Sequence, residues 1–358
     1  MKRIINVVLG ACVILFSQCN SRSEFTVQGT AILEGVRGGL KRKPVIFDLT
    51  LENRSKEYRI TAKALDGEWY NNEVAASDGT LNYFLEQDWP SLNDKIKDNN
   101  YQEFGKVGAG AFPEFSATPV QLIWLAYCSQ PYFNVGTNNM KIPLFNTRYA
   151  PTDGMKQIVS FSESNPNILE KIQCFATNIL YVAVRKTNIL LQPPYDKGYL
   201  LWQLKITAYT NIGKLTLPLS FEYEQYFPKA TNGANGEDVD CLYKGRFTAT
   251  NIIETVSSVN LLPVASKKDV PVADWSHNFP STGQVTPVIA YTLNDNKWKD
   301  PNDQGIQNQV LAIKQEIHLR EPPQDRKGVR AIVIAFLGAS FLLLCWFIKR
   351  EVKHKSNN

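Results

Sequence analysis

The chain has 358 residues, a formal charge of +5 at pH 7 and 44% hydrophobic residues, which together predict a packed core in one large or two ordinary domains. Lys2 and Arg3 contribute +2 and residues 349–358 contribute +3, so residues 4–348 are formally neutral. Because no basic stripe remains to bind phosphates, the composition excludes nucleic acid as a partner.

The first 21 residues are typical of a secretory signal peptide. A positive start, Met1 to Arg3, precedes the apolar stretch from Ile4 to Phe16, and small and polar residues follow. We therefore expect cleavage near residue 21 and export of the chain that follows. Lipidation at Cys19 is the alternative, because "FSQC" places a cysteine at the depth expected of a lipoprotein signal.

Alternation of apolar and polar residues is the clearest signal in the exported part. Residues 45–64 predict one β-hairpin and residues 199–226 a longer one, each with a turn segment between its strands. Further strands are expected at residues 25–33, 157–162, 179–184, 246–253, 287–293 and 310–319. Many short strands separated by Gly, Pro and Asn predict a mainly β ectodomain of the β-sandwich type, with one or two sandwiches.

Two stretches fit this pattern less well. The segment "PVQLIWLAYCSQ", residues 119–130, is either a buried strand or a helix, which its periodicity does not separate. The segment after Pro166 begins like a short helix. We expect a domain boundary near residue 150, in the polar stretch "NTRYAPTDGMK".

Residues 331–348 carry no charge and are followed by Lys349, Arg350, Lys353 and Lys355. As a helix rising about 1.5 Å per residue, this segment spans roughly 27 Å, close to the thickness of a bilayer's hydrocarbon core. We therefore expect a single-pass transmembrane helix with the lipid bilayer as a partner. The signal peptide sets the orientation, with the ectodomain outside and the C-terminus in the cytoplasm.

The end of the chain has three parts in a fixed order: Glu321-Pro322-Pro323, the apolar segment and the basic end. This order resembles C-terminal sorting signals that an envelope transpeptidase or exosortase cuts, and the resemblance implies removal of the helix. Charged residues between positions 325 and 330 favour a permanent anchor instead. The expected organisation is a signal peptide (1–21), two β-rich domains (22–150 and 151–320), a stem (321–330), a transmembrane helix (331–348) and a basic tail (349–358).

The exported part contains three cysteines, Cys128, Cys174 and Cys241. Three thiols allow at most one internal disulfide, which an oxidising compartment permits. Cys128 and Cys174 follow apolar segments, whereas Cys241 follows the loop-like "NGANGEDVD", so Cys128 to Cys174 is the expected pairing. Three reduced thiols, with Cys241 the most exposed, are the alternative.

Histidines offer little for catalysis. His318 lies on the polar face of a predicted strand and is expected to be solvated. His277 lies in a loop-like segment beside Asp274 and Ser276, which are residue types used in nucleophilic catalysis. Residues adjacent in sequence rarely form a working triad, so a structural role for His277 is favoured.

Carboxylate patterns predict neither a metal nor a cofactor. "DPNDQG", residues 300–305, begins like a calcium loop, but Gln304 and Leu311 occupy positions that need oxygen ligands. Glu222 and Glu224 lie on the polar face of a predicted strand, whereas glycoside hydrolysis needs carboxylates that face each other across the substrate. We therefore assign no catalytic, cofactor-binding or metal-binding residue.

The expected function is that of a membrane-anchored, extracytoplasmic binding or structural module of the cell envelope, with envelope proteins or glycans as further partners. The alternative is an envelope hydrolase acting on glycans, with carboxylates from separate loops. The sequence leaves catalysis open and favours its absence. Two carboxylates facing each other in an aromatic-lined cleft would favour the hydrolase, and an exposed apolar patch would favour a partner surface.

Overall fold

The computed structural model describes the ordered part of the chain in segments separated by gaps. The described residues are 24–37, 40–41, 43–65, 72–88, 102–109, 118–134, 139–140, 155–163, 165, 168–176, 178–179, 189–190, 198–228, 239–256, 258–277, 279 and 287–320. The predicted signal peptide, stem, transmembrane helix and tail lie outside the described residues. Among the described residues, no helix combines the length and the apolar character needed to cross a membrane.

The described residues are mainly β-structure, as predicted. The strands are β1 (Glu24–Arg37), β2 (Leu40–Lys41), β3 (Val45–Arg54), β4 (Glu57–Ala64), β5 (Glu73–Asp78), β6 (Asn82–Asp88), β7 (Gln102–Gly108), β8 (Phe133–Asn134), β9 (Asn139–Met140), β10 (Met155–Phe161), β11 (Leu169–Ala176), β12 (Asn178–Ile179), β13 (Ile189–Leu190), β14 (Tyr199–Ile212), β15 (Leu215–Pro228), β16 (Val239–Ile253), β17 (Val270–Asp274) and β18 (Ile289–Leu293). The helices are α2 (Pro119–Tyr127), the 3-10 turn η2 (Gln130–Tyr132) and α3 (Gln304–Arg320).

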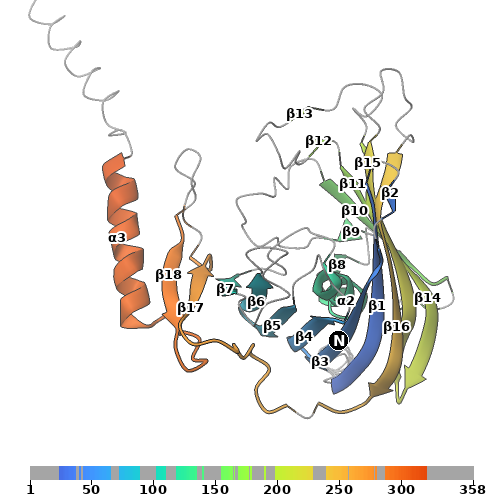
Figure 1. The fold of residues 1–358 in the computed structure, drawn as a ribbon, viewed down its shortest axis with the longest axis horizontal. Helices are drawn as coiled ribbons and strands as arrows, with labels where there is room; N and C mark the ends of the chain where they lie inside the picture. The colour runs from blue at the N-terminus through green and yellow to red at the C-terminus, as the bar shows by residue number, and fades with distance from the viewer. Residues whose placement is uncertain are drawn as a thin grey trace, which may run out of the picture. The chain divides into compact units, whose positions relative to one another are not determined.

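Among the described residues, one sheet of 16 strands runs in the order β18-β17-β7-β6-β5-β4-β3-β1-β16-β15-β14-β11-β10-β9-β8, with β2 beside β1, and β12 pairs with β13 separately. Neighbouring strands are antiparallel except β17 and β7, which are parallel. The expected sandwich would pack two sheets face to face, whereas here one sheet curves around helix α2 (Figure 1). Strands from both sides of position 150 belong to this sheet, and the division into two domains stays a prediction.

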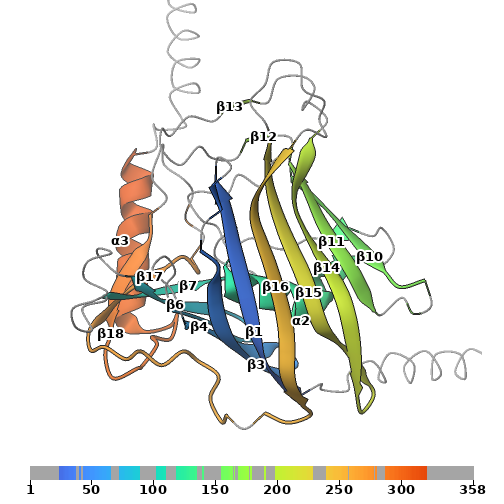
Figure 2. The ribbon, with the colours of Figure 1, turned by 45° about the vertical axis from the view of Figure 1, so that its right-hand side comes forward.

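Both predicted hairpins are confirmed. β3 and β4 pair from Phe47 to Arg54, and β14 and β15 pair along most of their length. Ser55 and Gly213 provide the positive φ angles, 61° and 55°, that these tight connections require. The long strands β14, β15, β16 and β1 lie side by side (Figure 2).

Helix α2 resolves the ambiguity of the apolar run at residues 119–130. Thr118 precedes it in an extended conformation and accepts a hydrogen bond from the N–H of Gln121, and Pro119 occupies the first turn. These are ordinary signals for a helix start. All nine residues of α2 are buried, so the helix lies inside the core and not on a surface.

Two other expectations are wrong. Residues 310–319 were expected to form a strand but belong to α3, because Ile306, Val310 and Ile317 are buried at helical spacing. The segment after Pro166 was expected to start a helix, but residues 169–176 form β11, where Ile172 and Cys174 alternate inward. Short apolar patterns fit both periods, and tertiary packing decides between them.

The residues between β16 and β17, numbers 254–269, form a connector that we call the strap. Six strands lie between β16 and β17 in the sheet: β1, β3, β4, β5, β6 and β7. The strap therefore connects two distant parts of the sheet. Leu261, Pro263 and Ala265 are buried along it at every second position. We define the outer face of the sheet as the face opposite α2. The strap crosses part of this face, near Thr26 and Glu52 at one side and Glu103 at the other.

The first half of the strap is held by a partly buried ion pair. Arg59 donates through Nε to Glu52 at 2.9 Å and through Nη2 to Ser258 Oγ at 2.6 Å, and the Ser258 hydroxyl donates to Glu52. Thr26 Oγ1 donates to the carbonyl of Thr255 at 2.7 Å. These side chains point outward because they alternate with the inward residues of their strands.

The second half of the strap is held by one buried carboxylate. Glu103, 3% exposed, accepts from the backbone N–H of Ser266 and of Lys267, both at 2.9 Å, and from the Ser266 hydroxyl at 2.6 Å. Trp298 Nε1 donates to the carbonyl of Pro263 at 2.8 Å. Charge-assisted hydrogen bonds therefore fix the strap at both ends.

Candidate functional site

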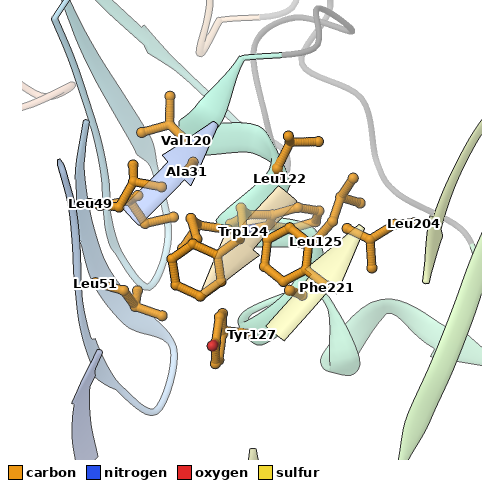
Figure 3. Close-up of a cluster of buried hydrophobic side chains, with 14 of the residues drawn as sticks. Ala31, Leu49, Leu51, Val120, Leu122, Trp124, Leu125, Tyr127, Leu204 and Phe221 are labelled. Atoms are coloured by element: carbon orange, nitrogen blue, oxygen red, sulfur yellow. The ribbon is translucent and has the colours of Figure 1, made fainter. Parts of the chain in front are cut away.

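Helix α2 occupies the inner face of the sheet, which we define as the face carrying Phe47 of β3 and Phe221 of β15. Figure 3 shows Trp124 of α2 between side chains of β3, such as Leu49, and Phe221 on the opposite side. The large side chains around the helix are almost completely buried. The sheet and α2 therefore enclose one continuous apolar core.

A narrow apolar gap separates the first half of α2 from the sheet, and it is too small for a water molecule. Its lining residues are Ala31, Leu33, Leu49, Pro119, Leu122, Ile123, Phe221, Arg246 and Phe247. Gly245 lets the helix approach, because a Cβ there would lie 2.8 Å from Leu33 Cδ2 and 3.4 Å from Leu122 Cδ1. The surface that lines this gap is apolar.

The other half of the inner face carries a line of polar side chains that we call the polar row: Asn53, Tyr58, Ser77 and Asn82. They lie directly opposite one another on β3, β4, β5 and β6. Each is between 5% and 8% exposed, so four buried polar residues cross the inner face. Buried polar groups need partners, and the row has them.

The end of α2 supplies two of those partners. Tyr58 Oη donates to Asn82 Oδ1 at 2.7 Å, and the side chain of Trp124 is hydrogen-bonded to Tyr58. Cys128 Sγ donates to Asn53 Oδ1 at 3.8 Å. Burial raises the pKa of Tyr58 well above its ordinary value, so its phenol stays protonated at neutral pH. The thiol of Cys128 is likewise kept protonated, because burial raises its pKa.

The outer face carries a shallow groove of about 220 Å³ over β1, β15 and β16. Glu222 pairs with Arg246 at 3.3 Å, and Glu224 pairs with Lys244 at 3.1 Å. A hydrogen bond from Tyr226 is the main reason that the pKa of Glu224 lies below its usual value. The two glutamates share one solvated strand face, as expected, and each has a cation beside it.

The residues around His277 are not joined into a dyad. Asp274 Oδ1 accepts the backbone N–H of Ser276 at 2.8 Å. Within the described residues, the buried atoms Ser276 Oγ and His277 Nε2 have no hydrogen-bond partner. His318 is exposed, as expected, but on α3 instead of a strand. Asp303 caps α3 by accepting the N–H of Gly305 at 2.9 Å, so the calcium-like segment is a helix start.

Cys128 and Cys174 are buried and Cys241 is partly exposed, in the order expected. All three thiols are free, so the Cys128 to Cys174 bond is not formed in this structure, and the pairing stays a prediction. Burial raises the pKa of Cys174 to about 12. Cys128 gains a different role, because its thiol contacts the polar row.

The polar row was not predicted from the sequence. One signal was available, since Asn53 and Tyr58 face each other next to the turn of the predicted hairpin. The two other members depend on the pairing of β4 with β5 and of β5 with β6, which no local pattern fixed.

No protein family model matches the chain, and no curated protein matches it. Among solved structures, the chain is similar to a domain described as an outer membrane lipoprotein-sorting protein from Vibrio parahaemolyticus, with 10% identity, a TM-score of 0.36 and coverage of 68% of this chain and 90% of that one. It is also similar to a LolA superfamily protein from Nitrosomonas europaea, with 8% identity, a TM-score of 0.32 and coverage of 66% of this chain and 88% of that one. A third similar structure is a DUF1329 family protein from Desulfovibrio piger, with 8% identity, a TM-score of 0.30 and coverage of 68% of this chain and 91% of that one.

Proposed function

We propose that this protein is a non-enzymatic binding module of the cell envelope that takes an apolar chain on its inner face, in the place that α2 occupies. One observation carries the proposal: a short helix, buried along all nine residues, fills a curved apolar surface. Such a helix covers the surface as a ligand would. The module acts outside the cytoplasm and is held at the bilayer by residues 331–348.

The forces that hold α2 favour exchange. Burial of apolar area contributes about 25 cal/mol per Å², without regard to direction, so an acyl chain of similar area regains what is lost when the helix moves out. Besides the polar row, Tyr127 Oη donates to the carbonyl of Pro218 at 2.5 Å.

A disulfide across the interface tests this exchange directly. Asn53→Cys places a second thiol beside Cys128, whose Sγ now lies 3.8 Å from Asn53 Oδ1. The full chain in phospholipid nanodiscs is exposed to a photoreactive acyl probe, and labelled peptides of β3, β15 and α2 are identified by mass spectrometry. We expect labelling of these peptides in the reduced variant and at least a tenfold loss when the disulfide forms.

The matched control is Asn53→Cys combined with Cys128→Ser, which cannot form the bond and should label equally with and without oxidant. Equal labelling of the oxidised and reduced tethered variant would show that α2 does not need to move. No labelling of inner-face peptides in the unmodified chain would overturn the proposal itself.

The orientation in the membrane has its own test. Protease added outside intact cells, or to spheroplasts where an outer membrane intervenes, should digest the ectodomain and leave the tail at residues 349–358 protected. A protected ectodomain would contradict the orientation.

The alternative of a glycan hydrolase has less support. Glu222 and Glu224, the carboxylate pair considered from the sequence, lie on one strand face and are each paired with a cation. Glu52 and Glu103, two of the buried carboxylates, hold the strap. These four carboxylates therefore have structural partners instead of facing one another across a cleft.

A further inference from the structure

The outer face carries two columns of opposite charge on neighbouring strands. Glu222 and Glu224 of β15 form the acidic column, and Lys244 and Arg246 of β16 form the basic column. The two columns are in register, because Glu222 lies directly opposite Arg246. In the same way, Glu224 lies directly opposite Lys244. Both columns line the shallow groove on this face.

These charged side chains keep much of their surface in solvent. The side chain of Arg246 is 68% exposed and that of Glu222 is 49% exposed, and they meet at 3.3 Å. A guanidinium has five N–H donors, so the bond to Glu222 leaves donors for a second acceptor. An isolated exposed ion pair contributes little to stability, whereas several charges in a network contribute more. A partner that brings an anion over Arg246 and a cation over Glu222 would complete such a network.

A second copy of the chain presents this complementary pattern. The two copies face each other after rotation by 180° about an axis that runs parallel to the strands, above the outer face and between β15 and β16. Because opposite residues share one level along the strands, Glu222 of each copy then faces Arg246 of the other. By the same register, Glu224 of each copy faces Lys244 of the other. A twofold contact makes every pair twice, so four ion pairs form between the copies.

The other twofold arrangement of two faces has its axis across the strands. That rotation keeps each column over its own counterpart, so the acidic column of one copy would lie over the acidic column of the other. Like charges that face each other across an interface repel, which suppresses this arrangement. Charge therefore selects the axis that is parallel to the strands.

The strands that flank the columns agree with this axis. The rotation places β14 of one copy over β1 of the other, because these strands lie on either side of β15 and β16. Lys205 shares its level with Glu222, and Ile32 shares its level with Arg246, so Lys205 faces Ile32 of the other copy. No residue at this level faces a like charge.

We infer that β15 and β16 form a contact surface for a second copy of this chain, with a twofold axis parallel to these strands. The sheet curves around α2, so two outer faces touch along a strip (Figure 1). A narrow strip gives an interface of the small, transient class, so the association is reversible. Because salt screens exposed charges, the association weakens as ionic strength rises. It does not depend on the exchange of α2, which concerns the opposite face.

Reversal of charge in one column tests the contact. Glu222→Arg puts two cations face to face in each twofold contact, and Arg246→Glu puts two anions face to face. Sedimentation velocity of the full chain in a non-ionic detergent, over a range of protein concentrations, measures the dissociation constant. We expect each variant to raise it at least about tenfold above that of the unmodified chain.

A mixture of the two variants restores opposite charges at both contacts. Equal amounts of the Glu222→Arg chain and the Arg246→Glu chain should associate to within about threefold of the unmodified chain. Misfolding of either variant would not be repaired by mixing, so recovery separates a lost contact from a lost fold.

Asp48→Arg and Lys63→Glu are the matched controls. Asp48 and Lys63 are exposed and lie directly opposite each other on β3 and β4, outside the strip that faces the second copy. These variants change the net charge as much as the column variants do. Each should leave the dissociation constant unchanged.

A cross-link locates the axis. A photoreactive amino acid at Thr248 of a light chain, mixed with unmodified chain carrying heavy isotopes, should react with heavy peptides that contain Ser220, because these residues share one level. Linkage to heavy peptides from other strands only would overturn the proposed axis. A chain that stays monomeric at low salt, or association that neither column variant weakens, would overturn the inference and leave acyl binding on the inner face untouched.

Discussion

The inner face of the sheet and the covered part of its outer face are held in opposite ways. The inner face is covered by α2, nine buried residues held mainly by apolar contact, with a weakly donating thiol at the end. Part of the outer face is covered by the strap, which buried Glu52 and Glu103 hold through short, directional hydrogen bonds. Apolar contacts are non-directional, so another molecule with a similar apolar surface can replace them. Directional hydrogen bonds require one particular backbone conformation. The proposed exchange therefore concerns the cover of the inner face, whereas directed hydrogen bonds keep the strap in place.

The inner face should be the more sensitive to lost volume. Trp124 is 1% exposed at the centre of the core, so Trp124→Ala should lower the free energy of unfolding by about 3–5 kcal/mol. Equilibrium urea unfolding followed by circular dichroism measures the change. Leu219→Ala, at a side chain 37% exposed, is the control and should change the value by less than about 0.5 kcal/mol. Similar effects at both sites would mean that α2 does not contribute to the core as described.

The outer face should be the more sensitive to lost charge. Glu103→Ala leaves the backbone N–H groups of Ser266 and Lys267 without their carboxylate, and we expect a loss of about 2–3 kcal/mol in the same measurement. Glu222→Ala, which removes an exposed ion pair with Arg246, should cost less than about 1 kcal/mol. If the two variants were equally stable, the strap would not be fixed by Glu103.

Close packing of α2 on the sheet can be tested without removing a contact. Gly245→Ala places a methyl group 2.8 Å from Leu33 Cδ2, and overpacking of this kind costs about 1–3 kcal/mol. Adding Leu33→Ala should recover part of the loss, so that the double variant is more stable than the sum of the single effects predicts. Strict additivity would place the strain elsewhere.

The uncovered part of the outer face should show the smallest effect, as a dependence on pH. The pKa of Glu224 is lowered in the folded state, first by the hydrogen bond from Tyr226 and then by Gln203 and Lys244. Its contribution to stability is therefore present above the ordinary glutamate pKa and is lost as pH falls through the folded value. At pH 7 the Glu224→Gln variant should be less stable than the unmodified chain, and this difference in stability should disappear as pH falls to 3. Thermal unfolding of both proteins between pH 7 and pH 3 measures the difference. A constant difference over that range would refute the assignment.

Local pattern predicted the strands but not what covers them. The alternation in residues 45–64 and 199–226 identified both hairpins, because each strand has one buried face. A buried face is equally consistent with a second sheet or with a helix, so the sandwich was a reasonable but wrong expectation. Thr118 and Pro119, a cap and a first-turn proline, were the residues that could have identified α2.

The candidate site could not be predicted from local sequence patterns, for a different reason. Asn53, Tyr58, Ser77 and Asn82 come together only through the register of three strand pairs. Each alone looks like a polar residue at the end of a strand. Their chemistry also depends on Cys128, which sequence reasoning assigned to a disulfide with Cys174.

The pairing of β1 with β16 has a consequence for biogenesis. Thr26 and Thr255 are bonded across 229 positions, so one edge of β1 gains its partner only after most of the chain has been made. The hairpin of β3 and β4 can satisfy the other edge early. Until β16 arrives, a long strand with a row of unpaired N–H and C=O groups is open to pairing with other chains. The nascent protein therefore passes through a period of aggregation risk whose length is set by the synthesis of the residues between these two strands.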